Sequence, residues 1–338
     1  MQADTVAIDI GGTHTRIAVV RGGRIGSRWE GLTAALATPE RGVTDGVVRA
    51  ALTQAAANGG SPIAAVGVGL AAAVDNSGSV LQPRDFGIPA GPLLRDAIGS
   101  AFGVAVVVDN DANLAAIAEH RLGAARGCAN VAVMTLGTNI GLGLILEGQL
   151  YRGAHGAAGE AGLLLVPVTS TGERSGDRQI VDAGRLGRGP SAGPAGYAWI
   201  EELVGGGALA AAAEATATSG GRTSDRRVFT AVARADPAIQ QLAGQALEGW
   251  ALILADLSVI LDLEAVVLTG GVAQDAAHLI GALQRRLGEL VAIAPEIRLG
   301  SLGPDAELLG ADLLARAALD LSAAQNARAG LSAHSAGG

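Results

Sequence analysis

Apolar residues gather in short runs along the chain, and glycine-rich turns or helical stretches separate these runs. Apolar runs bounded by glycine are typical of strands, whereas apolar residues three or four positions apart are typical of helices. Strands that alternate with helices in this way indicate an α/β fold. The first half predicts strands at TVAIDI, TRIAVV, RGGRIGSRW, IAAVGVGL (63–70) and VAVVVD (104–109), and helices at 42–58, GPLLRDAIGSAF and 112–122.

The second half begins with the layout of the first. ANVAVMTLGTNIGLGLILEGQL repeats the order of TVAIDIGGTHTRIAVVRGGRI, which is an apolar strand, a Gly/Thr turn, a second strand and a glycine hairpin. The turns at 9–13 and 135–139 take the same place in the two copies. We interpret this as an internal duplication in which two facing turns would enclose a ligand between two lobes. The alternative is a chance similarity between glycine turns.

The remaining segments are less regular. Residues 166–198 are rich in Gly, Ser, Pro and Arg and predict a mobile excursion, and the chain from Ser322 onward predicts a disordered tail. Between these segments the pattern predicts a helix with a glycine break in GYAWIEELVGGGALAAAAEA, a long helix in DPAIQQLAGQALEGWALILADLSVIL, a strand in EAVVLTGG and a helix in DAAHLIGALQRRL.

Composition narrows the classes of function. A chain of 338 residues can form two domains, and 49% hydrophobic residues allow a large core that 2% aromatic residues leave mainly to Ala, Val, Leu and Ile. Few aromatic residues argue against stacking platforms for single-stranded nucleic acid. A net charge of −8 and a pI near 5.2 argue against a phosphate-backbone footprint, so we expect no nucleic-acid partner. A small anionic ligand stays compatible, because backbone amides bind phosphate without net positive charge.

Cysteine usage and the most apolar run bear on the compartment. A single thiol, Cys128, forms neither an internal disulfide nor a multi-cysteine zinc site. The start MQADTVAIDIGG lacks the basic and apolar regions of a signal peptide. The run WALILADLSVILDLEAVVL is interrupted by Asp256, Asp262 and Glu264, which favours a buried helix and a strand over a membrane span. We therefore expect a cytoplasmic protein without a membrane partner.

Three glycine motifs could hold a nucleotide. In Asp9-Ile-Gly-Gly-Thr13 the glycines allow close backbone approach, so their amides and the threonine hydroxyl can cradle phosphate oxygens, and Asp9 could hold Mg²⁺ through water. Leu136–Asn139 could grip a second phosphate, and Leu268–Val272 would suit an adenosine moiety. Each motif alone could be an ordinary strand turn, but the three in this order favour an ATP site.

Two further clusters could bind an acceptor. Val108–Asn113 brings two carboxylates and two carboxamides to a strand end, where they could read sugar hydroxyls and accept a proton. The alternative is that Asp111 or Asn110 only caps the following helix. Gly153–Gly162 surrounds Glu160 with glycines, which implies tight turns near a ligand; the alternative is a solvated loop charge.

Together these residues resemble the ROK family (repressors, open reading frames, sugar kinases) of the actin-like ATPase fold, from about residue 5 to 318. The motifs that carry the resemblance are DIGGTHTRIAVV, VDNDANLAAIAEHRLGAARG, LGTNIGLGLILEGQLYRGAHGAAGEAG and VVLTGGVAQ. The resemblance implies a two-lobed α/β fold, ribonuclease H-like, with duplicated β-sheet domains, an interlobe cleft and assembly as a homodimer. The lobes would be a small one (1–110 with about 303–321) and a large one (111–302), followed by the tail 322–338.

The same resemblance implies roles for single residues. Asp111 would be the general base that takes the proton from the attacking hydroxyl, and Asp9 would hold Mg²⁺ through water. The acceptor would be bound by Asp75, Asn110, Asp111, Glu160 and Glu201. Apart from the resemblance, we also predict His155 as an acceptor contact. ATP would be bound by Asp9, Gly11, Gly12, Thr13, Gly137, Thr138, Gly270 and Gly271.

The sequence departs from the family pattern around the acceptor. The family motif AGExGH reads AGEAGL, so Leu163 replaces a His that contacts sugar and zinc. The cysteine-rich zinc motif is absent, and its last segment aligns with WIEEL, where Trp199 replaces a cysteine and Glu201 is retained. We therefore expect no zinc site. The missing His leaves a sugar hydroxyl unpaired, a change able to alter specificity; His155 would compensate for it or is an ordinary loop residue.

These features favour MgATP-dependent phosphorylation of the primary 6-hydroxyl of glucose or a glucose-like hexose, without zinc. The alternative keeps this chemistry on an amino sugar or a C7 cyclitol (7-hydroxyl), which the changed His and zinc region favours. A third hypothesis is a non-catalytic sugar-sensing regulator. Asp9, Asp111 and both phosphate turns count against it, and a phosphate motif that begins at residue 9 leaves no room for the DNA-binding module of ROK repressors.

Overall fold

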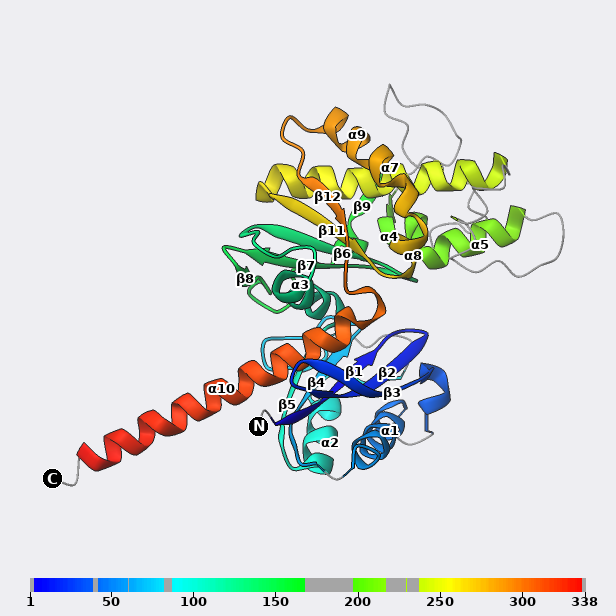
Figure 1. Cartoon of the computed structure of the whole chain (residues 1–338). Helices are drawn as coiled ribbons and strands as arrows, with labels where there is room; N and C mark the ends of the chain where they lie inside the picture. The colour runs from blue at the N-terminus through cyan, green and yellow to red at the C-terminus, as the bar shows by residue number, and fades with distance from the viewer. Residues whose placement is uncertain are drawn as a thin grey trace. The chain divides into compact units, whose positions relative to one another are not determined.

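The computed structural model describes residues 3–38, 42–59, 61–81, 87–167, 197–216, 229 and 237–335. The chain divides into two compact units (Figure 1). Unit 1 comprises Met1–Ala118, Arg152–Ala157 and Asp305–Gly338, and unit 2 comprises Glu119–Tyr151 and Ala158–Pro304. This division differs from the predicted lobes because residues 111–118 and the short segment Arg152–Ala157 belong to unit 1.

Unit 1 is built on a five-stranded sheet in the order β3-β2-β1-β4-β5. The first three strands form an antiparallel meander, and β4 and β5 add to it in parallel with β1. The β2–β3 turn contains Gly22 and Gly23 with φ of 57° and 74°, the two left-handed residues that a tight hairpin turn requires. The strands are β1 (Asp4–Ile10), β2 (His14–Arg21), β3 (Arg24–Leu32), β4 (Ile63–Leu70) and β5 (Ala105–Asn110).

Helices pack on both faces of this sheet, since β1 is buried along its whole length. One core joins Val6, Ile8 and Ile10 of β1 to residues of α1 and α2. A second core joins Ala7 of the same strand to residues of α3 and α10, as the two-residue period of a strand requires. The helices are α1 (Thr44–Ala56), α2 (Leu93–Phe102), α3 (Asp111–Leu122) and α10 (Ala306–Ser335).

Helix α10 corrects the prediction of a disordered tail from Ser322, because the helix continues to Ser335 (Figure 1). The segment that follows Ala306 is rich in alanine and leucine, the residues that lose least on entering a helix. Its low complexity therefore reflects a helical composition. Gly67 of β4 lies under this helix, since a Cβ there would come within 2.0 Å of the Ala311 carbonyl oxygen.

Unit 2 repeats the plan of the unit 1 sheet. Its order is β12-β11-β6-β7-β8, with an antiparallel meander of β6, β7 and β8 and two further strands parallel to β6. The match of two five-stranded sheets supports the duplication predicted from the repeated motifs. The strands are β6 (Val131–Leu136), β7 (Ile140–Leu146), β8 (Gln149–Leu150), β11 (Ala265–Thr269) and β12 (Glu296–Leu299).

The core of unit 2 forms around the long helix α7 (Pro237–Leu261). Trp250 of α7 is almost fully buried, donates a 3.2 Å hydrogen bond from Nε1 to the Val204 carbonyl oxygen and contacts Phe229 at a ring-centroid distance of 5.4 Å. Ile239–Leu261 is the one described helix long and apolar enough to cross a membrane. Since its residues contribute to this core, it fulfils the prediction of a buried helix ahead of a strand.

Short elements complete unit 2. The helix predicted in GYAWIEELVGGGALAAAAEA (196–215) is wrong near its start, where Tyr197–Trp199 forms strand β10 and pairs with β9 (Leu165–Pro167). Most of the predicted excursion 166–198 lies outside the described residues. The remaining helices are α4 (Ile200–Val204), α5 (Gly206–Thr216), α8 (Gly271–Asp275) and α9 (Ile280–Leu290).

Candidate active site

The turn between β1 and β2 presents bare backbone. Gly11 donates from its amide to the His14 carbonyl oxygen at 3.0 Å, and a Cβ on Gly11 would come within 2.9 Å of that oxygen. The position of a Cβ on Gly12 meets no atom within 4 Å, and Gly12 and Thr13 are exposed. The turn therefore leaves open space beside amides and a hydroxyl, as a phosphate cradle requires.

Thr33 stabilises this turn by hydrogen bonds, a role that was not predicted from the sequence. Its hydroxyl donates to the Gly11 carbonyl oxygen at 2.7 Å, and its amide donates to the Thr13 carbonyl oxygen at 2.9 Å. Thr33 is fully buried and its hydroxyl also lies 2.9 Å from the Thr15 hydroxyl. No local motif marks such a residue, because its partners lie on another strand and turn.

Asp9 lies at the end of β1, directly opposite Arg16 of β2 in the strand register. The Arg16 Nη1 atom lies 3.2 Å from Asp9 Oδ2 and 3.8 Å from Glu307 Oε2, so both carboxylates share one guanidinium. Burial raises the pKa of Asp9 to about 6. Burial and the nearby Asp9 carboxylate raise the pKa of Glu307 to about 8.

These carboxylates fit a divalent cation. Asp9 is buried with one shared guanidinium, and the inaccessible Glu307 Oε2 has no hydrogen-bond partner in the described part of the chain. Oxygen ligands of this kind are those that Mg²⁺ prefers, and Mg²⁺ commonly keeps several waters and takes only one or two carboxylates. The described residues contain no group of three or more side chains of the His, Cys, Asp and Glu types placed to bind a metal. The fit is therefore to a cation held partly by water or substrate.

Asn110 and Asp111 lie where β5 ends and α3 begins. The Asn110 Oδ1 atom accepts from the Ala112 amide at 2.9 Å, which caps the helix, and its Nδ2 atom donates to the Ala72 carbonyl oxygen at 3.1 Å. Asp111 Oδ1 accepts from the Ala112 amide at 2.8 Å. Asn110 therefore caps the helix, as the alternative interpretation of this cluster expects, and the assignment of Asp111 to the acceptor stays a prediction.

Asp75 organises its own loop. Its Oδ1 atom accepts from the Ser77 amide at 2.8 Å, the Ser77 hydroxyl at 2.7 Å and the Ser79 amide at 2.9 Å. These bonds, of which that from the Ser77 hydroxyl contributes most, lower the pKa of Asp75. One carboxylate oxygen is therefore used to shape the loop that follows β4.

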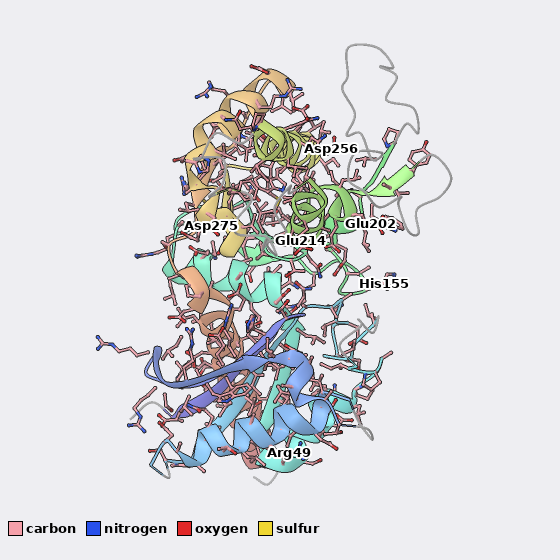
Figure 2. All side chains as sticks on the ribbon, turned by 90° about the vertical axis from the view of Figure 1, so that its right-hand side faces the viewer. Arg49, His155, Glu202, Glu214, Asp256 and Asp275 are labelled. Atoms are coloured by element: carbon pink, nitrogen blue, oxygen red, sulfur yellow. The ribbon has the colours of Figure 1, made fainter. Side chains whose placement is uncertain are left out.

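His155 lies in the segment Arg152–Ala157 of unit 1 and is exposed, with its side chain extending away from the ribbon (Figure 2). The segment packs tightly on the Asp75 loop, because a Cβ on Gly156 would come within 2.3 Å of the Val74 carbonyl oxygen. Gly156 has φ of 82°, a conformation that glycine adopts without strain. His155, Asp75 and Asp111 thus all belong to unit 1.

In unit 2, three glycine segments meet around the turn after β6. Gly206 and Gly207 donate from their amides to the carbonyl oxygens of Gly137 (3.0 Å) and Thr138 (2.9 Å). Gly270, with φ of 94°, lies against the Leu136 carbonyl oxygen, which a Cβ would approach to 2.5 Å. The sequence predicts the turns at Gly137 and Gly270. For Gly206 and Gly207 it predicts only a break in a helix.

Glu160 and Glu201 belong to unit 2 as well. Glu201 Oε2 accepts from the Ile140 amide at 3.0 Å, at the first residue of β7. A Cβ on Gly162 would come within 2.7 Å of the same oxygen, so this glycine lets Glu201 reach the strand. Glu160 precedes a single 3₁₀ turn, Ala161–Leu163, and Leu163 is 38% exposed.

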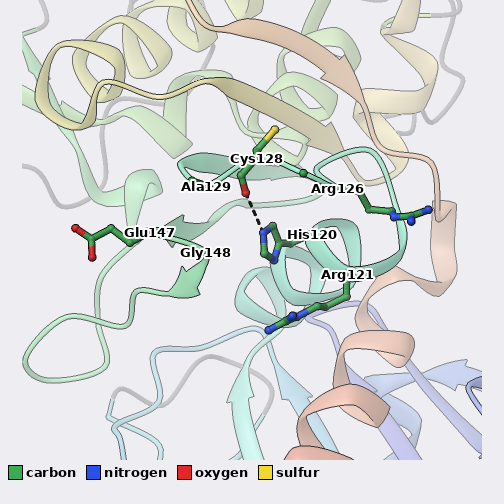
Figure 3. Close-up of a pocket in the computed structure, with 8 residues that line it drawn as sticks. His120, Arg121, Arg126, Cys128, Ala129, Glu147 and Gly148 are labelled. Carbon is green, nitrogen blue, oxygen red and sulfur yellow. Dashed lines mark hydrogen bonds between the residues drawn. The ribbon is translucent and has the colours of Figure 1, made fainter.

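A cavity of about 460 Å³ lies at the other end of the unit 2 sheet (Figure 3). Two of its lining residues contact each other, since His120 Nε2 lies 3.0 Å from the Cys128 carbonyl oxygen. Its lining includes Ala129, which precedes β6, whereas Gly137 and Thr138 follow that strand. None of the predicted site residues lines it, so it stands apart from the candidate site.

Comparisons with known proteins agree with these observations. The chain matches the ROK family over residues 5–318. It is 32% identical over 314 residues to the bifunctional enzyme NanE/NanK of Brucella melitensis. This alignment covers 92% of this chain and 54% of the Brucella protein. The chain is 26% identical to the N-acetylmannosamine kinase of Haemophilus influenzae, over 90% of this chain and 93% of the relative. The chain thus spans about half the length of the Brucella protein.

A solved structure extends the likeness to the fold. The ROK family glucokinase of Streptomyces griseus, solved with glucose and AMPPNP, aligns with a TM-score of 0.73 and 28% identity over 93% of this chain and 99% of that one. The family and the actin-like α/β fold predicted from the sequence are therefore confirmed.

Proposed function

Since the chain belongs to the ROK family, we propose that it is an ATP-dependent kinase that phosphorylates the primary 6-hydroxyl of glucose or a glucose-like hexose. The observation that carries the proposal lies in unit 1. Strands β1, β4 and β5 are parallel neighbours, and Asp9, the Ala71–Ala73 loop and Asp111 lie at their carboxyl ends. Carboxyl ends of parallel strands meet at one edge of a sheet, which is where open α/β sheets bind ligands.

Each predicted site residue has a chemical task. Asp111 orients the acceptor hydroxyl and accepts its proton as transfer proceeds. The amides of Gly11 and Gly12, with the Thr13 hydroxyl, hold phosphate oxygens, and Gly137 and Thr138 of unit 2 hold the remaining phosphates. Gly270 and Gly271 border the adenosine. Positioning and charge neutralisation supply most of the rate in phosphoryl transfer, so preorganised backbone suits this reaction.

Mg²⁺ bound near Asp9 would neutralise charge that develops on the transferred group. The chain's own contribution is to keep the Asp9 carboxylate in place, which Arg16 does through its 3.2 Å contact. The remaining acceptor contacts are assigned to Asp75, Asn110, His155, Glu160 and Glu201. Small-molecule acceptor and MgATP are the partners, a homodimer is the expected assembly, and no zinc takes part.

A second acceptor class is favoured by Leu163. Its side chain is apolar and 38% exposed directly after the Glu160 turn, where it offers no hydrogen bond to a hydroxyl. A site that lacks such a donor prefers acceptors that do not need it, such as an amino sugar or a C7 cyclitol phosphorylated at its 7-hydroxyl. The Haemophilus influenzae relative is an N-acetylmannosamine kinase, which makes amino sugars the first alternative to test.

The test is ADP release by purified protein with MgATP against glucose, mannose, their amino and N-acetyl derivatives, and C7 cyclitols. Asp111→Asn is the matched control, because an asparagine Oδ1 can still accept from the Ala112 amide and preserve the helix start. We expect this variant to lower kcat by about 10²- to 10⁴-fold with an unchanged melting temperature.

Each outcome decides between the hypotheses. Turnover of hexoses that Asp111→Asn abolishes supports a hexose kinase without zinc. Turnover of amino sugars or cyclitols alone moves the proposal to that acceptor class. If ATP binds and no acceptor is turned over, the non-catalytic sugar-sensing regulator replaces the kinase.

A further inference from the structure

Asp109 is a carboxylate that the proposed reaction does not use, although it lies two residues from Asp111. It is 3% exposed at the end of β5. Its Oδ1 atom accepts from the Asn110 amide at 2.8 Å and from Asn113 Nδ2 at 2.8 Å. Its Oδ2 atom accepts from Arg152 Nε at 2.8 Å and lies 2.7 Å from Arg152 Nη2. Both oxygens are thus committed to the protein, which leaves Asp109 closed to a substrate.

Arg152 is the first residue of a short segment that belongs to a different unit from the residues on either side of it. Residues 119–151 and 158–304 belong to unit 2, whereas Arg152–Ala157 between them belongs to unit 1. The segment therefore leaves one unit, joins the other for six residues and returns. Its attachments to unit 1 include the Arg152–Asp109 ion pair, a 3.4 Å hydrogen bond from Asn76 Nδ2 to the Ala154 carbonyl oxygen and the packing of Gly156 on Val74.

Of these attachments, the ion pair is the strong one. A hydrogen bond between charged groups is about twice as strong as a neutral one, and the 3.4 Å amide contact is long for a hydrogen bond. Although the Arg152 side chain is 32% exposed, its removal would leave the buried Asp109 carboxylate without its cation, which is destabilising. The segment that carries His155 therefore depends on the same carboxylate that braces the first turn of α3.

We propose that Arg152 is a positioning residue for the acceptor: through Asp109 it fixes the His155 segment and the start of the Asp111 helix in one arrangement. The inference rests on the proposed kinase function. Arg152 acts through Asp109 and donates no proton to the reaction. Its loss should therefore affect how the acceptor is held rather than how ATP is held.

The experiment compares Arg152→Met with Arg21→Met as a matched control. Asp4, the partner of Arg21, also has a 5% exposed side chain and accepts from Arg21 Nε, Arg21 Nη2 and an asparagine, Asn58. Arg21 lies in the same unit, but its partner stands at the start of β1, away from the predicted site residues. Each variant thus loses one arginine from a buried aspartate of unit 1.

Arg152→Met should raise the KM for the acceptor by about tenfold or more, since small misplacements of a bound reactant are costly. The KM for ATP should change by less than about twofold. Amide hydrogen exchange should accelerate in residues 109–113 and 152–157 of Arg152→Met and stay unchanged there in Arg21→Met. A second change, Asp109→Asn, in the Arg152→Met background removes the uncompensated charge; it should restore much of the melting temperature but not the acceptor KM.

The inference is overturned if Arg152→Met loses stability to the same extent as Arg21→Met while its acceptor KM and its exchange at 152–157 match those of the control. Recovery of the acceptor KM in the double variant would also overturn it, because the defect would then be charge alone. If wild-type protein turns over no acceptor, the kinase proposal fails by itself. The exchange measurement then decides whether Arg152 positions the segment.

Discussion

Asp9 and Glu307 illustrate how burial can outweigh the effect of a neighbouring arginine on the pKa of a carboxyl group. Arg16 Nη1 is within 4 Å of both carboxylates, yet burial raises the pKa of Asp9 to about 6, and burial together with the Asp9 carboxylate raises the pKa of Glu307 to about 8. Their ordinary values are 3.8 and 4.5, so the folded protein binds more protons than the unfolded chain between those values and the raised ones. Stability from this pair is thus present at acid pH and lost as the pH rises toward 8.

Glu307→Gln should remove much of that dependence. A glutamine keeps the shape of the side chain and cannot ionise. Between pH 5 and pH 8, the melting temperature of the variant should therefore fall less than that of the wild type. At pH 8 we expect the variant to melt roughly 1–3 °C higher than wild type. Thermal melts at constant ionic strength across this range check the slope.

Glu296→Gln is the control for that measurement. Arg298 lowers the pKa of Glu296, so its contribution to stability is lost only on acidification below its ordinary pKa of 4.5. The control should therefore follow the wild-type slope between pH 5 and pH 8. Equal slopes in all three proteins would show that Glu307 is already ionised in the folded state.

Site residues that stand together in one local motif could be predicted from the sequence. Residues that contact the site from distant positions in the chain could not. Gly11, Gly12 and Asp9 stand in one turn, so their pattern is local. Thr33 holds that turn from 22 residues away, and Glu307 meets Arg16 only because α10 packs on the unit 1 sheet. Such pairs follow from tertiary packing, which no local spacing encodes.

At the scale of elements, prediction succeeded where burial dictates the pattern. IAAVGVGL is buried over most of its length as β4, and the glycine turns of the two meanders closed the hairpins that were expected. The prediction was wrong at Tyr197–Trp199, which pairs with β9, because the helical residues that follow extend an apparent helical pattern over this short strand. The prediction for the end of α10 was wrong because its alanine-rich sequence resembles a low-complexity tail.

The contact between α5 and the turn after β6 makes a prediction at this scale. A Cβ on Gly206 would come within 2.2 Å of the Gly137 carbonyl oxygen and 3.0 Å of Val272 Cγ2. Gly206→Ala should therefore displace the turn proposed to hold phosphate, raise the KM for ATP by about tenfold and leave the acceptor KM nearly unchanged. Steady-state kinetics with each substrate varied in turn measures both constants.

Gly244→Ala is the matched control, since a Cβ at this position of α7 meets no atom within 4 Å. It should stabilise the protein by about 1 kcal/mol through helix propensity and leave the kinetics unaltered. An ATP KM in Gly206→Ala equal to that of Gly244→Ala would show that the α5 contact does not shape the nucleotide site.

At the scale of the whole molecule, the repeated motifs predicted two related sheets, and both sheets have the same strand order and directions. The excursion of Arg152–Ala157 was not predictable in the same way. Its residues lie between β8 and Glu160 in the sequence, and their contacts with unit 1, such as the Asp109 ion pair and the Gly156 packing, join residues far apart in the chain. The duplication determines the two related sheets. Contacts between residues far apart in the sequence determine to which unit a predicted site residue such as His155 belongs.

This distribution predicts which parts of each unit a ligand protects from amide hydrogen exchange. The acceptor residues of unit 1 lie on three segments, and an acceptor sugar alone should slow exchange there, at 72–80, 109–113 and 152–157. A non-hydrolysable ATP analogue alone should instead protect the glycine turns, at 11–13 in unit 1 and at 136–139, 205–207 and 270–272 in unit 2.

The reason is that each ligand stabilises the backbone it binds, and the two proposed sets of residues share no segment. Asp111→Asn should leave the ATP footprint unchanged, because the variant alters no glycine turn. An acceptor footprint confined to Glu160 and Glu201 would instead assign acceptor binding to unit 2. In that case the carboxyl edge of the unit 1 sheet would hold only phosphate, and Asp111 would lose its proposed role as the base.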